Sequence, residues 1–353
     1  MTFEELGYNK AVNALINFNE PDYELGRVII EHRDRYSVQT PNNTFQAEIT
    51  GGLRYTAESK SDLPAVGDWV KLSVFDDKSA VIHEIFPRFS ILERQAVGKF
   101  GEKQIIATNV DVAFIMQAVG HDFNLNRLER YLTVCTASSI KPIIVLSKID
   151  LIGREEINQL TKSIKARIKD ILVYPISNQT LSGYEKLKKT IISGNTYCIL
   201  GSSGVGKSSL TNNLLQKQKM DVNSVSESTS KGKHTTSHRE LIVLPEGGVL
   251  VDTPGMRELG ITGGSEGIEH TFGKISILAK NCSFNDCKHM EEPGCAVLEA
   301  LESGELDQAS YENYHKLKRE QAHFSSTIAE RRAKDKKQGK LYKRIQEEKR
   351  KRR

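Results

Sequence analysis

The chain has 353 residues, enough for two or three domains, and its 38% hydrophobic and 27% charged residues are ordinary for a soluble protein. No apolar run reaches the roughly 18 residues that a membrane-spanning helix needs, and Met1 to Lys10 lacks the pattern of a secretory signal. We therefore expect a cytoplasmic protein without a membrane partner, and a monomer.

The charge is distributed unevenly along the chain. The net charge is +5, but residues 329–353 hold 13 Lys or Arg against 4 Asp or Glu, a net +9, which leaves −4 for the rest. Such a basic end suits a polyanion such as nucleic acid, although a solvated charged helix has the same composition.

Residues 24–87 contain short β-rich segments separated by polar or glycine turns. Five strands in about 65 residues favour a small barrel, and an oligonucleotide-binding (OB) barrel is the first choice. An SH3-like barrel or another small β domain remains open, because periodicity alone does not separate them. The predicted strands are 26–30, 35–38, 44–49, 68–74 and 80–85.

Residues 88–105 are interpreted as a linker, after which buried-type strands alternate with helical segments. This alternation predicts a parallel sheet with helices on both faces. The predicted strands are 110–116, 142–146, 171–174, 196–200, 241–244 and 248–251, the last two joined by a turn, and the predicted helices are 126–138, 157–169 and 209–215. A polar, cysteine-bearing region follows from Thr262, and the chain from Tyr311 onward is predicted to be helical.

A complete phosphate-binding motif, GxxxxGK[ST], lies between a predicted strand and a predicted helix. Its glycines allow backbone N–H groups to point at phosphate oxygens, and the helix N-terminus adds partial positive charge. Lys207 is expected to reach the β- and γ-phosphates, and Ser208 to bind Mg²⁺. The nucleotide-binding residues predicted here are Gly201, Ser202, Ser203, Gly204, Val205, Gly206, Lys207, Ser208 and Ser209.

Two further segments complete a nucleotide hydrolase pattern. Asp252 to Gly255 (DTPG) follows a buried strand, which places Asp252 at Mg²⁺ and the Gly255 amide near the γ-phosphate. Residues 231–237 (KGKHTTS) predict a polar loop in which Thr235 or Thr236 completes the Mg²⁺ shell; the sequence does not decide which. An ordinary turn and an ordinary loop are the alternatives.

The segment 146–150 (LSKID) predicts guanine selectivity. The Asp150 carboxylate can accept hydrogen bonds from guanine N1–H and the 2-amino group, which adenine lacks, and the Lys148 stem can pack on the base. Ser147 stands where such motifs usually have Asn, and its shorter side chain puts a contact with the base or phosphate-binding loop in doubt. The loop 176–179 (ISNQ), which contains Ser177 and follows another strand, is predicted to close over the guanine.

The order of these segments is informative. Ordinary GTPases have the phosphate-binding loop first and the base segment last, whereas here residues 147–150 and Ser177 precede residues 201–208. Each loop follows a strand, so a circular permutation of the chain preserves the site.

A third cluster, CxxxxCxHxxxxxC, predicts a metal site. Three thiolates and one imidazole within 14 residues can close a tetrahedral Zn²⁺ site with no open position, so the ion would be structural. The ligands predicted are Cys282, Cys287, His289 and Cys295. Cys135 and Cys198 lie in apolar runs and are expected to be buried thiols, not a disulfide.

Taken together, GSSGVGKS, GKHTTS, DTPG and the cysteine–histidine segment resemble the ribosome small subunit-dependent GTPase A (RsgA/YjeQ) family over nearly the whole chain. The resemblance implies an all-β OB-fold domain (1–90), a circularly permuted α/β GTPase domain (91–262) and a zinc-binding helical domain (263–353). It also implies binding to the small ribosomal subunit and its rRNA, a role in late subunit maturation, and GTP hydrolysis stimulated by that subunit.

The position after DxxG, where many GTPases have a water-orienting Gln, is Met256. His234 is the best substitute, because an imidazole exchanges protons near neutral pH. The catalytic residues predicted are therefore His234, Lys207, Thr235 and Thr236, with GTP, Mg²⁺ and one Zn²⁺ as ligands. The alternatives are an ATP-dependent RNA-binding hydrolase and a non-catalytic RNA-binding module that only holds nucleotide.

Overall fold

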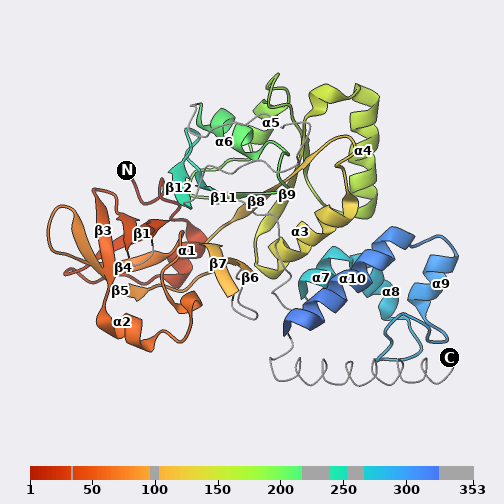
Figure 1. Cartoon of the computed structure of the whole chain (residues 1–353), viewed down its shortest axis with the longest axis horizontal. Coiled ribbons are helices and arrows are strands. Elements are labelled where there is room, and N and C mark those ends of the chain that lie inside the picture. The colour runs from red at the N-terminus through yellow and green to blue at the C-terminus, as the bar shows by residue number, and fades with distance from the viewer. Residues whose placement is uncertain (33–34, 96–102, 217–238, 253–265, 326–353) are drawn as a thin grey trace, which may run out of the picture.

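The computed structural model (Figure 1) describes residues 1–32, 35–95, 103–216, 239–252 and 266–325. A β-barrel, a helix-covered sheet and a group of C-terminal helices follow one another along the chain. The strands are β1 (Glu24–Glu31), β2 (Tyr36–Gln39), β3 (Thr44–Ile49), β4 (Trp69–Val74), β5 (Ser79–Ile85), β6 (Ile91–Gln95), β7 (Lys103–Thr108), β8 (Val112–Ala118), β9 (Lys141–Ser147), β10 (Val173–Pro175), β11 (Thr196–Leu200), β12 (Glu240–Val243) and β13 (Val249–Asp252). The helices are α1 (Lys10–Leu15), α2 (Gly51–Thr56), α3 (Leu125–Ala137), α4 (Arg154–Arg167), α5 (Tyr184–Lys188), α6 (Lys207–Leu215), α7 (Glu266–Thr271), α8 (Gly273–Ala279), α9 (Ala296–Glu302) and α10 (Gln308–Ser325), with 3-10 turns η1 (Lys60–Asp62) and η2 (Ile149–Leu151).

The N-terminal barrel is closed. Its strands pair in the ring order β1-β2-β3-β5-β4, and β1 pairs with β4 to complete the ring. The pairings are antiparallel except β3 with β5, and α2 lies between β3 and β4 in the chain. Alternate residues such as Val28, Phe45 and Leu72 fill the interior. This arrangement confirms the predicted OB-like barrel.

The central sheet follows the order β10-β9-β8-β11-β13-β12. Strands β8, β9, β10, β11 and β13 run parallel, whereas β12 is antiparallel to β13. One face packs on α3 and α4, and the other packs on α5 and α6. The helix-covered sheet predicted from the alternating pattern is therefore confirmed, and so is the turn that joins β12 to β13.

The interpretation of residues 88–105 as a linker is wrong. Residues 91–95 and 103–105 of this segment are strand, because β6 pairs antiparallel with β7. Leu92 and Ile106 are buried in the main core, while Glu93 and Lys103 form an exposed cross-strand ion pair. Charged residues alternate with apolar ones in this segment, so it looked like a polar linker. Its apolar side is buried only because distant parts of the folded chain pack against it.

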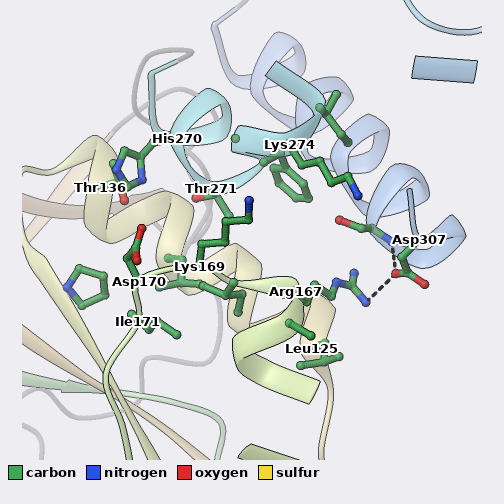
Figure 2. A pocket seen from close by; sticks show the side chains of 18 of the residues that line it. Leu125, Thr136, Arg167, Lys169, Asp170, Ile171, His270, Thr271, Lys274 and Asp307 are labelled. Atoms are coloured by element: carbon green, nitrogen blue, oxygen red, sulfur yellow. Dashed lines mark hydrogen bonds and ion pairs between the residues drawn. The ribbon is translucent and has the colours of Figure 1, made fainter. Parts of the chain in front are cut away.

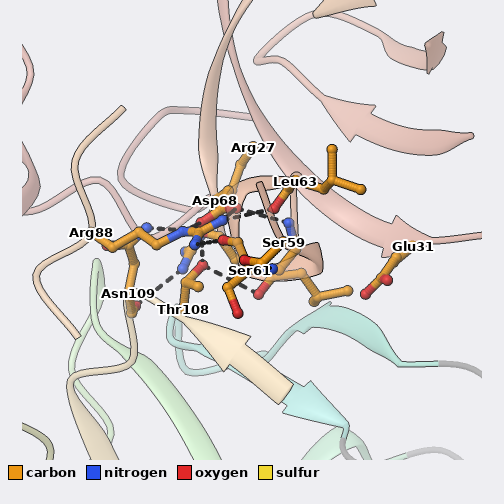
Figure 3. Close-up of polar contacts among 12 residues, drawn as sticks. Arg27, Glu31, Ser59, Ser61, Leu63, Asp68, Arg88, Thr108 and Asn109 are labelled. Atoms are coloured by element: carbon orange, nitrogen blue, oxygen red, sulfur yellow. Dashed lines mark hydrogen bonds and ion pairs between the residues drawn. The ribbon is translucent and has the colours of Figure 1, made fainter. Parts of the chain in front are cut away.

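The barrel continues directly into the central sheet, because β1 also pairs with β12. Behind this pairing, the Arg27 side chain is completely buried (Figure 3). Burial lowers the pKa of Arg27 to about 10, an effect that Asp111 and Asp68 oppose, so the guanidinium stays charged at neutral pH. It donates hydrogen bonds to the Leu6, Gly67 and Asn109 carbonyls and to Thr196 Oγ1.

A second buried polar group secures the same junction. The Asp68 carboxylate accepts a bidentate pair from Arg88, at 2.7 and 2.6 Å, and a hydrogen bond of 2.6 Å from Thr108 Oγ1 (Figure 3). Asp68 is on the barrel side and Thr108 ends β7, so the barrel and the hairpin share one charged network. Asp68, Arg88 and Thr108 all have hydrogen-bond partners in this network, which favours one arrangement of the three side chains.

The C-terminal helices α7 to α10 pack on the α3 face of the sheet. Ile268, Phe272, Val297 and Leu317 join the core that also holds Leu128 of α3. Cys135 and Cys198 are buried free thiols in this core, as predicted. Within the described part of the chain, no helix combines the length and apolar character needed to cross a membrane.

Candidate nucleotide site and metal centre

The phosphate-binding loop connects β11 to α6. Gly201, Gly204 and Gly206 have φ of 151°, 79° and 97°, a region that favours glycine, and these angles fold the backbone into a tight loop. A Cβ at Gly201 would lie 2.5 Å from the Met116 carbonyl oxygen, so the loop also needs glycine to approach β8. Ser202 and Ser203 are half-buried and Gly204 is exposed.

Lys207, the first residue of α6, folds back over this loop. Its Nζ donates to the carbonyls of Gly201, at 2.9 Å, and Ser202, at 2.7 Å. The ammonium is thereby held at the mouth of the loop, where the backbone and the helix N-terminus favour an anion. Ser208 and Ser209 follow in the first turn of α6 and are half-buried.

The segment that follows β9 contacts the phosphate-binding loop directly. Ser147 is completely buried, and its Oγ donates to the Val205 carbonyl at 2.7 Å. Lys148 takes a left-handed conformation with φ 62°, and η2 then presents Asp150 at the surface. The serine in place of Asn thus retains the contact with the loop that its shorter side chain had put in doubt.

The turn after β10 braces the loop from the other side. Ser177 is buried, and its Oγ accepts from the backbone N–H groups of Gln179 and Thr180. Asn178 Nδ2 donates to the Gly206 carbonyl at 3.0 Å. A Cβ at Gly206 would lie 2.4 Å from that amide, so glycine is required here by close approach as well as by φ.

Tyr184 fixes the orientation of Asn178. Its hydroxyl donates to Asn178 Oδ1 at 2.7 Å and accepts from Asn213 Nδ2 of α6 at 3.0 Å. Burial raises the pKa of Tyr184 to about 12, which the Asn213 hydrogen bond partly opposes, so the phenol remains a donor. The sequence placed Asn178 in the predicted guanine loop but did not predict its partners, because single residues such as Tyr184 and Asn213 in helices carry no motif.

All of these groups lie at one edge of the sheet. Strands β8, β9, β10, β11 and β13 are parallel, so the segments that follow them meet at the carboxyl edge. Asp252, the last residue of β13, therefore ends on the side of the phosphate-binding loop. The predicted residues His234, Thr235, Thr236, Gly255 and Met256 lie outside the described residues.

The metal cluster assembles between α8 and α9. The candidate ligand atoms of Cys282, Cys287, His289 and Cys295 all lie within 4.8 Å of one another. Cys282 Sγ is 3.8 Å from Cys295 Sγ, and His289 Nδ1 is 3.5 and 3.4 Å from those two sulfurs. Zn–S bonds of about 2.3 Å and a Zn–N bond of about 2.0 Å give tetrahedral edges of about 3.8 Å (S···S) and about 3.5 Å (S···N). The four residues therefore fit Zn²⁺.

Neighbouring groups orient these ligands. Burial, and to a smaller extent Lys318, lower the pKa of His289, which favours the neutral imidazole that binds metals. Tyr311 Oη of α10 donates to the His289 carbonyl at 2.6 Å. Burial, the main cause, and the adjacent thiols raise the pKa of Cys287 to about 11, the opposite of what a bound dication does.

These sites, in this chain order, define a circularly permuted P-loop GTPase with a C-terminal metal centre. The family model described as RsgA GTPase matches residues 85–262. A relative from Listeria monocytogenes serotype 4b, named small ribosomal subunit biogenesis GTPase RsgA 2, is 41% identical over 92% of this chain and 91% of its own. A relative from Bacteroides thetaiotaomicron, named small ribosomal subunit biogenesis GTPase RsgA 1, is 39% identical over 93% of this chain and 92% of its own. The chain belongs to the RsgA GTPase family, and it is a GTP hydrolase.

Solved structures agree with the fold. YjeQ from Thermotoga maritima superposes with a TM-score of 0.64 at 24% identity, covering 85% of this chain and 99% of that one. A structure described as YloQ, a circularly permuted GTPase, gives 0.64 at 25% identity, covering 89% and 100%.

Proposed function

We propose that this GTPase binds the small ribosomal subunit, acts in its late maturation, and hydrolyses GTP to GDP and phosphate faster when bound. The printed names of the relatives, small ribosomal subunit biogenesis GTPases, support the partner. The closed OB-like barrel and the basic residues of 329–353 support RNA as the contacted surface. The proposed domains are 1–90, 91–262 and 263–353.

The observation that carries the nucleotide assignment is the hydrogen bond from Ser147 to the Val205 carbonyl. It joins the guanine segment to the phosphate-binding loop although the two are in permuted order. We assign GTP binding to Ser147, Lys148, Asp150, Ser177, residues 201–209 and Gly255, Mg²⁺ to Ser208 and Asp252, and structural Zn²⁺ to Cys282, Cys287, His289 and Cys295.

Guanine selectivity is tested by Asp150→Asn. The carboxylate accepts from guanine N1–H and the 2-amino group, whereas an amide can donate to the 2-oxo group of xanthine. The variant should lose GTP affinity by 10-fold or more, roughly one lost charge-assisted pair, and gain xanthosine triphosphate affinity. Unchanged GTP binding would exclude Asp150 from the base site and reopen the ATP-dependent alternative.

For hydrolysis, we propose that His234 orients the attacking water, and that Lys207 with Thr235 or Thr236 stabilises the phosphates and Mg²⁺. Met256 has no group that orients water well, so turnover should be slow until subunit binding brings His234 to the attacking water. His234→Ala should reduce subunit-stimulated turnover while GTP binding persists. Full stimulated turnover in the variant would remove His234 from the mechanism.

The ribosomal partner is tested by co-sedimentation with purified small and large subunits at two salt concentrations. Binding should be confined to the small subunit and should weaken as salt rises, because phosphate contacts release counterions. Equal binding to both subunits would favour the second candidate, a general RNA-binding hydrolase.

A further inference from the structure

Helix α3 contacts the phosphate-binding loop through Arg127. Asn124 caps the helix, its Oδ1 accepting from the Arg127 backbone N–H at 3.1 Å, which fixes Arg127 in the first turn. From there, Arg127 Nη1 donates to Ser202 Oγ at 3.1 Å. A side chain from α3 thus reaches the second residue of the phosphate-binding loop.

The next residues of α3 bind the C-terminal helix α10. Glu129, which is 1% exposed, accepts hydrogen bonds from Asn313 Nδ2 at 2.6 Å and Ser310 Oγ at 3.1 Å. Arg130 forms a bidentate ion pair with Glu320, one arm of which is 2.7 Å long. Three nearly consecutive residues, 127, 129 and 130, therefore link the nucleotide loop to α10.

The following turn of α3 packs tightly against α7. A Cβ at Gly267 would lie 2.5 Å from the Thr133 carbonyl oxygen and 2.8 Å from Ala137 Cβ, so the two helices touch backbone to backbone. Thr133 Oγ1 also donates to Thr271 Oγ1 at 3.2 Å. This close approach leaves no room for α7 and α3 to move independently.

Elsewhere, the junction with the C-terminal helices is hollow. A cavity of about 730 Å³ lies between α3, the end of α4 and the segment before β10 on one side and α7 and α8 on the other, and its walls include Lys169, Ile171 and Lys274 (Figure 2). An ion pair of 3.3 Å between Arg167 and Asp307 spans it. The contacts of α3 with α7 and α10 therefore lie beside this open space, which α3 itself borders through Leu125, Leu132 and Thr136.

We propose that α3 couples the phosphate-binding loop to the C-terminal helices, with Arg127 as a positioning residue that acts through Ser202. A nucleotide that changes the conformation of the phosphate-binding loop changes the hydrogen bond between Ser202 Oγ and Arg127. Because α3 is a rigid helix, the resulting displacement of Arg127 is transmitted to α7 and α10. This route differs from the chain connection through residues 253–265. It rests on the proposed function only where the small subunit is named as the partner that senses the shift.

The coupling is tested without the ribosome by hydrogen exchange in the full-length protein, loaded with GDP or with a non-hydrolysable GTP analogue. The α10 amides of the wild type should exchange at different rates in the two states, and Arg127→Met should abolish that difference. Barrel amides near Val28 should be unaffected in either state. Arg127→Lys, which retains a cation, should restore part of the difference, and Arg154→Met, at an exposed position in the first turn of α4, is the matched control.

The second readout is the ratio of small-subunit affinities in the two nucleotide states. We expect a wild-type ratio of roughly 5-fold or more, as allosteric couplings usually give, and a ratio near one for Arg127→Met. Ser202→Ala should have the same effect, and the double variant should add nothing. A variant that keeps both the exchange difference and the affinity ratio, even if it melts earlier, overturns the coupling. Absence of subunit binding in the wild type overturns the proposed function alone, because the exchange test still stands.

Discussion

The barrel and the C-terminal helices are attached to the nucleotide-binding sheet in different ways. The barrel meets the sheet through a β1–β12 pair, Ile30 with Glu240, and through the fully buried Arg27, whereas the C-terminal helices pack on α3 next to a cavity that α3 borders. Backbone pairing with satisfied buried charges makes the barrel an extension of the sheet. The contacts of α3 join the phosphate-binding loop to α7 and α10, and the coupling proposed above therefore runs toward the C-terminal helices and not toward the barrel.

The largest effect should come from the cysteine–histidine cluster, where a bound Zn²⁺ would stabilise the C-terminal helices. Structural zinc contributes roughly 10 kcal/mol to small domains of this kind. Cys295→Ser should therefore lose bound zinc and make α7 to α10 sensitive to proteolysis, while the barrel stays protected. Cys135→Ala, a buried thiol outside the cluster, is the control for zinc content. Retention of zinc in Cys295→Ser would mean that the cluster is not the metal site.

Arg27→Met should be the most costly substitution at the barrel junction. It leaves three buried carbonyls without their charged donor, which predicts a loss of about 3–5 kcal/mol in the free energy of unfolding. Arg35→Met removes an arginine whose ion pair with Glu48 is exposed, and it should change stability by less than about 0.5 kcal/mol. Equal losses for Arg27→Met and Arg35→Met in denaturant titrations would show that the buried Arg27 hydrogen bonds do not stabilise the junction.

A glycine-to-alanine substitution should have different effects on stability at the two junctions. Gly7 has φ +88°, and a Cβ there would lie 2.0 Å from Arg27 Nη1, so Gly7→Ala should destabilise by about 2–4 kcal/mol. Gly273 lines the cavity with nothing within 4 Å of its Cβ position, so Gly273→Ala should be neutral or stabilise α8 by up to about 1 kcal/mol. Thermal melting of the two variants measures these changes. Similar losses of stability in both would contradict the difference between the two junctions.

At the C-terminal junction, Glu129→Gln should cost about 1.5–3 kcal/mol, because Arg167 and Asn313 lose a charged acceptor. The loss should appear as faster hydrogen exchange in α10, with β1 unchanged. Glu58→Gln in an exposed barrel loop is the matched control. Faster exchange in both α10 and β1 would show that the two junctions unfold together.

Some of these features could be predicted from the sequence and others could not. The OB-like barrel, the phosphate-binding loop and the metal cluster were predicted because each has a local signature: alternation, glycine spacing or ligand spacing. The hairpin of β6 and β7, buried Arg27 and buried Glu129 were not, because a charged residue is buried only when distant segments supply partners, such as Thr196 for Arg27 and Asn313 for Glu129. The Ser147 bond to Val205 likewise joins segments 58 positions apart.

The central claim is that this permuted site hydrolyses GTP in response to the small ribosomal subunit. The direct test is the turnover of GTP and ATP by the intact protein, with and without purified small subunits. We predict slow GTP turnover alone, a strong increase with small subunits, and ATP turnover at background in both cases. GTP turnover that small subunits leave unchanged would contradict the account.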